Sequence, residues 1–317
     1  MSSFQFGIYP GGATGTETGV TTGPADNASE IQNALQTLQG NTPSFLVRAY
    51  IGYHSKNKIR SSTPEYPEQY ISNGRSLDLV LCFQSEEDEM EHWTEFIRAT
   101  IRKFGRQLSK IQITEEANVD LPALDGHYKN SRKALVRGVV AAKDEIIKLK
   151  LDTKVGFNAT PDFTPDKLFW TEIASLAFND FVKSIDYVGI DFFPDVFKPI
   201  PPGIDLRAAL QGVFAQFRSD MRLIGIQDDV QLHVTENGCP TSESRTHEQQ
   251  ALMLEKIVRL IFELRNEFNI TTYELFGLRD ADSSIQNIFY QFGIMRDNYA
   301  PKKAFDVYRK LISELSS

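Results

Sequence analysis

The sequence predicts an α/β protein, a closed (β/α)8 TIM barrel that forms a single domain over residues 1–317. Short apolar runs rich in β-branched and aromatic residues recur about every 40 residues, which divides the 317 residues into eight units. Amphipathic stretches with helical period separate most of these runs, as in βα units around a parallel sheet. No Pro/Gly/Ser-rich linker divides the chain into halves. These observations favour the closed barrel over a doubly wound open sheet.

The apolar runs and the amphipathic stretches give the expected elements in order. The strands are expected at residues 4–9, 45–50, 77–83, 110–114, 154–158, 187–192, 230–235 and 272–276. The helices are expected at residues 28–38, 89–104, 130–150, 166–181, 206–223, 247–268 and 302–315. Only the connection after the second strand, residues 64–75, lacks a helical pattern.

The composition excludes two classes of partner. Hydrophobic residues make up 41% and charged residues 24% of the chain, and no segment approaches the roughly 20 apolar residues that span a membrane. With 42 acidic against 34 basic residues and no basic block, the chain has no electrostatic footprint for nucleic acid. We therefore expect a soluble protein that binds neither membrane nor nucleic acid.

The two cysteines and the first residues indicate a compartment. Cys82 and Cys239 lie far apart, which fits a reducing environment better than a disulfide-stapled secreted domain, so both thiols are expected to be free. The first residues carry neither a basic segment nor an apolar run of signal-peptide length. The expected location is the cytoplasm.

Two strands end on glutamates. The run IQITEE ends in Glu115 and Glu116, and the run LHVTE ends in Glu236, directly before Asn237 and Gly238. Glu116 and Glu236 lie 120 residues, or about three units, apart, which places them on strands 4 and 7. Active sites of such barrels lie at the carboxyl ends of the strands, so both acids share one face. Two such carboxyl groups suffice for glycoside hydrolysis without a metal or cofactor, with a carbohydrate as the partner.

Strand alternation predicts where these side chains point. Ile111 and Ile113 share one side of the strand, and Glu116 has the opposite parity. If the isoleucines face the helices, Glu116 faces the barrel axis and Glu115 the helix layer. For Glu236 the test decides nothing, because this residue is in line with apolar residues of its own strand.

These segments resemble motifs of a known clan. Residues 114–118, TEEAN, are similar to the Trp-Asn-Glu-Pro-Asn of retaining glycosidases on (β/α)8 barrels, and residues 234–238, VTENG, resemble their Thr-Glu-Asn-Gly. The resemblance implies that Glu116 is the acid/base and Glu236 the nucleophile. Arg48 matches an arginine that many clan members keep beside the nucleophile, where its charge favours the ionised form. The stretches 186–194 and 289–305 also resemble clan segments, so the likeness spans most of the chain.

The chain departs from the clan's motifs in two places. Glu115 stands where the clan usually has the asparagine that bonds the substrate's 2-hydroxyl, and a carboxylate accepts such a bond but does not donate one. Repulsion between Glu115 and Glu116 would also raise one pKa. Asp191, Phe192 and Phe193 stand where the clan often has Asn-Tyr-Tyr, which removes the phenol that commonly holds the nucleophile.

Other residues are candidates for substrate contact. Asn118 is kept from the strand-4 motif, and Phe192 and Phe276 could stack on a sugar ring, although aromatic residues near strand ends are more often core. Arg279 follows strand 8 and could bind sugar hydroxyls or pair with the aspartates beside it.

Several further features favour structural interpretations. The glycine-rich residues 11–19 lack a phosphate-binding motif and indicate a flexible loop at the barrel mouth. The five histidines show no metal-ligand spacing, so no metal is expected, and His233 is better read as packing inside strand 7.

The sequence therefore predicts a glycoside hydrolase that retains configuration, with its carboxyl groups roughly 5 to 5.5 Å apart rather than the wider spacing of inverting enzymes. One alternative is a catalytically impaired barrel that binds carbohydrate without turnover, as the two departures indicate. A third is a barrel lyase or isomerase that uses the same acids for proton transfer.

Overall fold

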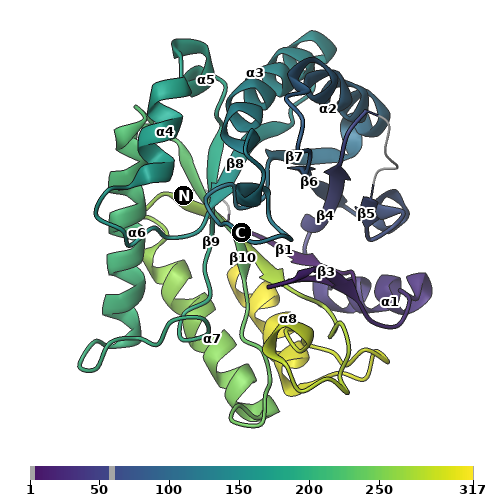
Figure 1. Ribbon diagram of the computed structural model, residues 1–317. Coiled ribbons are helices and arrows are strands. Elements are labelled where there is room, and N and C mark those ends of the chain that lie inside the picture. The colour runs from purple at the N-terminus through teal and green to yellow at the C-terminus, as the bar shows by residue number, and fades with distance from the viewer. Residues whose placement is uncertain (1–3, 57–60, 317) are drawn as a thin grey trace.

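A computed structural model of the chain describes residues 4–56 and 61–316. Within these residues eight parallel strands pair side by side in the order β1-β11-β10-β9-β8-β7-β6-β4. The first strand also pairs with β4, which closes the sheet (Figure 1). The predicted closed barrel is therefore confirmed. Its strands are β1 (Gln5–Tyr9), β4 (Phe45–Tyr53), β6 (Arg75–Phe83), β7 (Leu108–Ile113), β8 (Lys154–Ala159), β9 (Tyr187–Asp191), β10 (Gln231–Asn237) and β11 (Ile270–Phe276).

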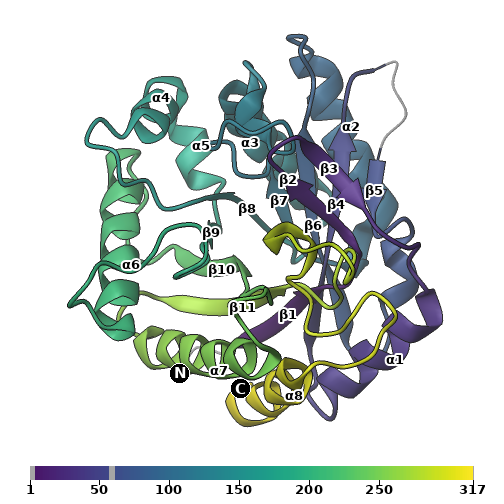
Figure 2. The same cartoon turned by 60° about the horizontal axis from the view of Figure 1, so that its bottom comes forward.

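Helices surround the barrel (Figure 2). They are α1 (Ala28–Gln39), α2 (Met90–Phe104), α3 (Ser131–Leu149), α4 (Leu168–Leu176), α5 (Asn179–Lys183), α6 (Leu206–Leu223), α7 (His247–Leu264) and α8 (Lys303–Leu315). As expected, the second connection has no α-helix among its described residues, only strand β5 (Ser61–Thr63) and the short 3-10 helix η1 (Pro67–Tyr70). The remaining 3-10 helices are η2 (Gly105–Gln107), η3 (Asp125–His127) and η4 (Ile288–Tyr290).

Local signals explain where helices start and stop. Thr246 and Gln249 form a reciprocal capping box at the start of α7. Gly40 and Gly105 end α1 and α2 at positive φ, which glycine adopts without steric cost. The predicted helix 166–181 is instead broken into α4 and α5, because Ala177 and Phe178 are extended.

The glycine-rich segment after β1, where a flexible loop was expected, forms an antiparallel hairpin of β2 (Ala13–Thr16) with β3 (Gly19–Thr22). The hairpin packs against η4 in the connection between β11 and α8. Arg279 joins the same two regions, because its guanidinium lies 2.7 Å from Asp26. A β-carbon on Gly12 would lie 2.1 Å from this guanidinium, so a larger residue there would displace Arg279 from its present place.

Apolar and polar side chains of the barrel separate into two layers. Ile113 of β7 faces outward, so close to α3 that a β-carbon on Gly138 would lie 2.6 Å from it. The barrel interior instead holds charged groups: Asp78 contacts Arg48 at 2.6 Å and Lys110 at 3.3 Å. The polar interior leads directly to the carboxyl ends of the strands.

Three smaller expectations can be compared with the described residues. Cys82 and Cys239 are both free and both buried, as predicted. His233 is buried and its ring stacks on Tyr187 at 4.2 Å, which confirms the packing interpretation. No described helix combines the length and apolarity that crossing a membrane requires.

Candidate active site

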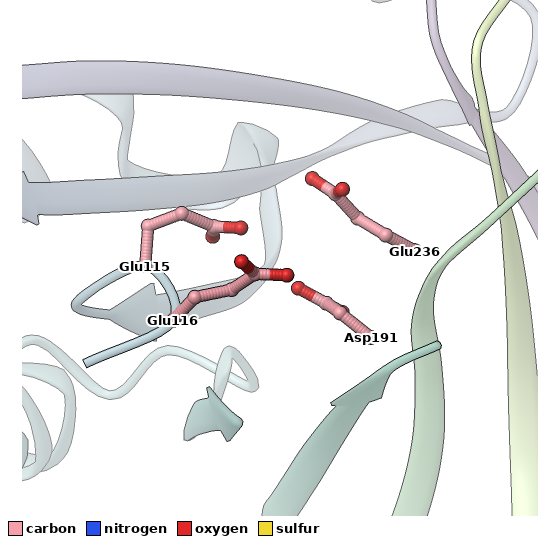
Figure 3. Close-up of side chains that lie close together, drawn as sticks. All are labelled: Glu115, Glu116, Asp191 and Glu236. Atoms are coloured by element: carbon pink, nitrogen blue, oxygen red, sulfur yellow. The ribbon is translucent and has the colours of Figure 1, made fainter. Parts of the chain in front are cut away.

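The end of β7 delivers two carboxylates to the barrel mouth. Regular strand geometry stops at Ile113, and both Thr114 (φ 68°) and Glu116 (φ 44°) adopt left-handed backbone conformations. The backbone N–H of Glu116 donates to Asn158 Oδ1 at 2.9 Å, which holds this bend against the end of β8. Glu116 then projects into the centre, as expected (Figure 3).

Glu115 does not face the helix layer, contrary to the alternation argument. Its Oε2 accepts from Gln112 Nε2 at 2.6 Å and lies 3.3 Å from Arg48 Nη2, inside the barrel. The reason is the left-handed turn at Thr114, because alternation holds only while the backbone remains extended. Both neighbouring glutamates therefore point to the same centre.

Glu236 reaches the site through an irregularity in β10. The pairing of β10 with both neighbours shifts after Val234, between residues that precede and follow Thr235. Such a bulge re-aims a side chain. Leu232 and Val234 pack in the apolar core, whereas Glu236 leaves their alternation and enters the mouth.

Four carboxylates meet there (Figure 3). Glu115, Glu116, Glu236 and Asp191, the last residue of β9, each offer an oxygen, and these four oxygens lie within 4.8 Å of one another. All four side chains are buried, and Glu116 and Glu236 retain only 9% and 8% exposure. Oxygen donors this close are also a set that a hard divalent cation accepts.

Among the residues that the structure describes, Arg48 is the cation that touches this cluster. Its Nη2 lies 3.3 Å from Glu115 and its Nε 3.7 Å from Glu236. The same guanidinium donates to Asp78 at 2.6 Å and to Gln112 at 3.0 Å, so it is fixed from below. Its place beside Glu236 is the one that the clan resemblance implies.

Tyr50 supplies a phenol that the sequence had seemed to lack. Its hydroxyl donates to Glu236 Oε1 and accepts from Arg48 Nε at 2.7 Å. Tyr50 lies two residues after Arg48 on β4, so both side chains leave the strand on the same face. That shared parity was the available sequence signal. The phenylalanines after Asp191 therefore do not leave the candidate nucleophile without a phenol.

Burial and crowding perturb the acids. Burial raises the pKa of Glu116 well above its usual value, and the charges of Asp191 and Glu236 add to the effect. Burial and the charges of Glu236 and Asp191 raise the pKa of Glu115, and the charge of Glu116, the predicted source of repulsion, makes a smaller contribution in the same direction. Burial and Asp191 raise the pKa of Glu236 to about 8, against the opposing effects of Arg48 and Tyr50. At neutral pH the cluster therefore holds protons.

Asp125 and Asp191 are site residues that the sequence did not single out as candidates. Asp125 is fully buried, and its Oδ2 accepts from the backbone N–H of Phe83 at 2.6 Å and of Glu115 at 3.0 Å. Asp191 accepts from Thr235 at 2.5 Å and from the amide of Asn158. The available sequence signal for Asp191 was its place at the end of a strand, the same signal that identified Glu116 and Glu236. Asp125 lies in η3, where no sequence pattern marked it.

The other predicted contacts lie outside the cluster. Asn118 uses its amide on Thr160, with bonds of 2.9 to 3.1 Å, and so ties two loops together. Phe192 packs on Phe214 of α6 in the apolar core.

The two remaining predicted contacts lie on and after β11. Phe276 stacks on Tyr9 at 5.2 Å. Arg279 pairs with Asp26 rather than with the aspartates beside it, because Asp280 bonds Lys302 at 2.7 Å and Asp282 caps Ser284.

Comparison with known proteins gives similar folds and no sequence relative. No protein-family model matches the chain, and no curated protein matches it in sequence. Among solved structures, the family 1 β-glucosidase of Thermotoga maritima matches with a TM-score of 0.64 at 12% identity, over 99% of this chain and 98% of that one. The chain has the fold of these glycosidases.

Two further matches are longer than this chain. A family 39 glycoside hydrolase of Bacteroides cellulosilyticus matches with a TM-score of 0.66 at 12% identity, over 100% of this chain. A monomeric β-xylosidase of Caulobacter crescentus matches with a TM-score of 0.64 at 12% identity, again over 100%. The chain spans 64% and 70% of their lengths. The predicted likeness to glycosidase barrels is confirmed for the fold.

Proposed function

We propose that this protein is a glycoside hydrolase that cleaves O-glycosidic bonds with retention of configuration, and that the whole chain acts as one catalytic domain. The observation that carries the proposal is the meeting of Glu116 and Glu236, from β7 and β10, with oxygens within 4.8 Å of each other. Such close carboxyl groups suit a double displacement, whereas inversion needs room for a water between them.

The two glutamates have different surroundings and therefore different roles. Glu236 is contacted by Arg48 and Tyr50, which favour its ionised form, so it attacks the anomeric carbon. No described side chain donates a hydrogen bond to the carboxyl group of Glu116, whose raised pKa keeps it protonated. Glu116 then protonates the departing oxygen and, as a base, activates the water that releases the sugar.

The remaining contacts of the substrate follow from the same placement. Glu115 lies next to both glutamates and, with Asp191, offers acceptors to sugar hydroxyls. Phe276, at the end of β11, presents a partly exposed ring beside Tyr9. Arg279 and Asn118 act on the substrate indirectly, through the loops that they hold, because their polar groups are already bonded to those loops.

A second function, carbohydrate binding without turnover, is favoured by one observation. Four carboxylates share a site with one arginine, and the pKa of Glu236 is raised to about 8, so much of this residue is protonated at neutral pH. A protonated carboxyl group is a poor nucleophile. Tight sugar binding without hydrolysis at any pH would establish this alternative.

The test is hydrolysis of a panel of activated aryl glycosides by the wild type and by Glu236→Gln and Glu116→Gln. We expect turnover by the wild type and a loss of at least about a thousandfold in Glu236→Gln, since the covalent step disappears. In Glu236→Ala, azide that occupies the emptied nucleophile site should displace the leaving group, restore part of the rate and give a glycosyl azide whose anomeric configuration is inverted relative to the substrate. The matched control is Glu30→Gln on the outer face of α1, an exposed site that should not change the rate. Full activity in Glu236→Gln would contradict the proposed roles.

A further inference from the structure

The geometry points to a second binding site, for a phosphate group carried by a small molecule, in a pocket between the β10–α7 and β11–α8 loops. We call it the loop pocket. Its volume is about 410 Å³, within the range of small-molecule sites. None of the four clustered carboxylates lines it. The lining residues are Thr241, Ser242, Glu243, Arg245, Thr246, His247, Asp280, Ser283, Gln286, Gln291, Arg296 and Lys302.

The charges of the loop pocket favour an anion, although the whole chain carries −8. Asp280 and Lys302 neutralise each other at 2.7 Å. The Arg245 guanidinium donates to two backbone carbonyl oxygens, those of Pro240 at 3.3 Å and Asp195 at 2.9 Å, and it forms no ion pair with a carboxylate among the described residues. Apart from the pair of Asp280 and Lys302, the pocket lining therefore contains two arginines, Arg245 and Arg296, and one exposed acid, Glu243.

Arg296 is available to a ligand. It is exposed, and its side chain has no ion pair or hydrogen bond with the residues that the structure describes. His247 lines the same pocket, and burial followed by the charges of Lys302 and Arg296 lowers its pKa. Guanidinium groups bind phosphate through paired N–H donors, so an unpaired arginine at a pocket is suited to this group.

Two helices begin at the same pocket. Thr246 and His247 are the N-cap and first residue of the 18-residue α7, and Lys302 is the N-cap of the 13-residue α8. Helix starts carry partial positive charge, so both add to the field of the arginines. The loops after strands 7 and 8 are also where (β/α)8 barrels frequently bind phosphate. The hydroxyls of Thr241 and Ser283 already donate to Gln291 and Asp280, whereas the hydroxyl of Ser242 lines the pocket and pairs with Ser244 at 3.2 Å.

The inference is tested by calorimetric titration of the wild-type protein with inorganic phosphate, and then with glycerol 3-phosphate against glycerol. We expect one phosphate per chain, and a loss of affinity of at least about tenfold in Arg296→Glu. Arg106→Glu, an exposed arginine at the opposite end of the barrel, is the matched control and should bind as the wild type does. Tighter binding of glycerol 3-phosphate than of phosphate would identify a phosphate ester as the ligand, and the reverse order free phosphate.

Two results would overturn the inference: no binding of either probe at millimolar concentration, or equal weakening in Arg296→Glu and Arg106→Glu, which marks an adventitious ion only. Circular dichroism of both variants checks that they fold. Glu236→Gln should bind phosphate as the wild type does, so the result does not depend on the proposed glycosidase activity.

Discussion

At the scale of single residues, Tyr50 is the group whose removal should change the chemistry with the least change in shape. Tyr50→Phe removes the hydroxyl that donates to Glu236, and a hydrogen bond to a charged group contributes about 1.5–3 kcal/mol. We therefore expect kcat to fall by about 10- to 100-fold. Because this bond opposes the rise in the pKa of Glu236, the acidic limb of the pH–rate profile should also move to higher pH.

The measurement is a pH–rate profile of Tyr50→Phe on an aryl glycoside that the wild type cleaves. Tyr66→Phe, at an exposed tyrosine, is the control. A uniform drop at all pH values, with an unmoved acidic limb, would mean that Tyr50 only positions Glu236 and does not favour its ionised form.

Residue-level prediction from the sequence succeeded for Arg48 and Ile113, which lie on regular strands: Arg48 faces the mouth and Ile113 packs outward against α3. Glu116 also faces the mouth as expected, although it follows the left-handed Thr114. The prediction failed for Glu115, because alternation does not hold beyond a left-handed residue. For Glu236 it could not decide, since the bulge after Val234 has no distinct sequence mark.

At the scale of elements, Asp125 in η3 joins the end of β6 to the turn that follows β7. One carboxylate oxygen accepts from the backbone of Phe83 and of Glu115, and the N–H of Asp125 donates to the carbonyl of Glu115 at 3.0 Å. Asp125→Ala leaves two buried N–H groups without acceptors, at a cost of about 1–3 kcal/mol each. Asp125→Asn keeps an oxygen in place and should cost much less.

Urea unfolding of both variants measures the free energy of unfolding, and kcat shows whether the turn still presents Glu116. Burial raises the pKa of Asp125 to about 7, so Asp125→Asn should match the wild type most closely below that pH. Equal stability of Asp125→Ala and Asp125→Asn would show that the two hydrogen bonds contribute little.

Elements with a strong period were predictable, and those fixed by distant contacts were not. The eight barrel strands, and the lack of an α-helix between β4 and β6 in the described part of that connection, follow from local patterns. The β2–β3 hairpin depends on packing against η4, which lies more than 260 residues away in the sequence. The break between α4 and α5 interrupts a stretch whose helical pattern continues through it.

At the scale of the whole molecule, the described barrel interior joins more acids than bases. Beside Arg48 and Lys110 lie Asp78 and Glu274, and above them the four clustered carboxylates. Burial raises the pKa of Glu274 well above its usual value, as it does for the cluster, so several of these acids hold protons when the protein is folded. At neutral pH these carboxyl groups are ionised in the unfolded chain, so folding is accompanied by the uptake of protons.

This difference predicts how stability depends on pH. A carboxyl group whose pKa is raised by folding contributes most below its ordinary pKa of 4.5, and the contribution is lost as the pH rises through the folded value, which for Glu236 is about 8. The free energy of unfolding should thus fall between about pH 5 and pH 8. Glu115→Gln removes one negative charge from the cluster, so the raised pKa values of the neighbouring carboxyl groups should move back toward their ordinary values. The fall in the free energy of unfolding should then be smaller by about 1.4 kcal/mol for each pKa unit of this change.

Urea unfolding at several pH values across this range tests the prediction, with Glu30→Gln on α1 as the matched control. We expect Glu115→Gln to be more stable than the wild type at pH 8 and nearly equal to it at pH 5, where the replaced acid is already protonated. A wild type whose stability rises between these pH values would mean that Arg48 and Lys110 compensate the buried carboxylates. In that case Glu116 would lose the protonated form that its role as an acid requires, and the site would have to rely on ionised carboxylates alone.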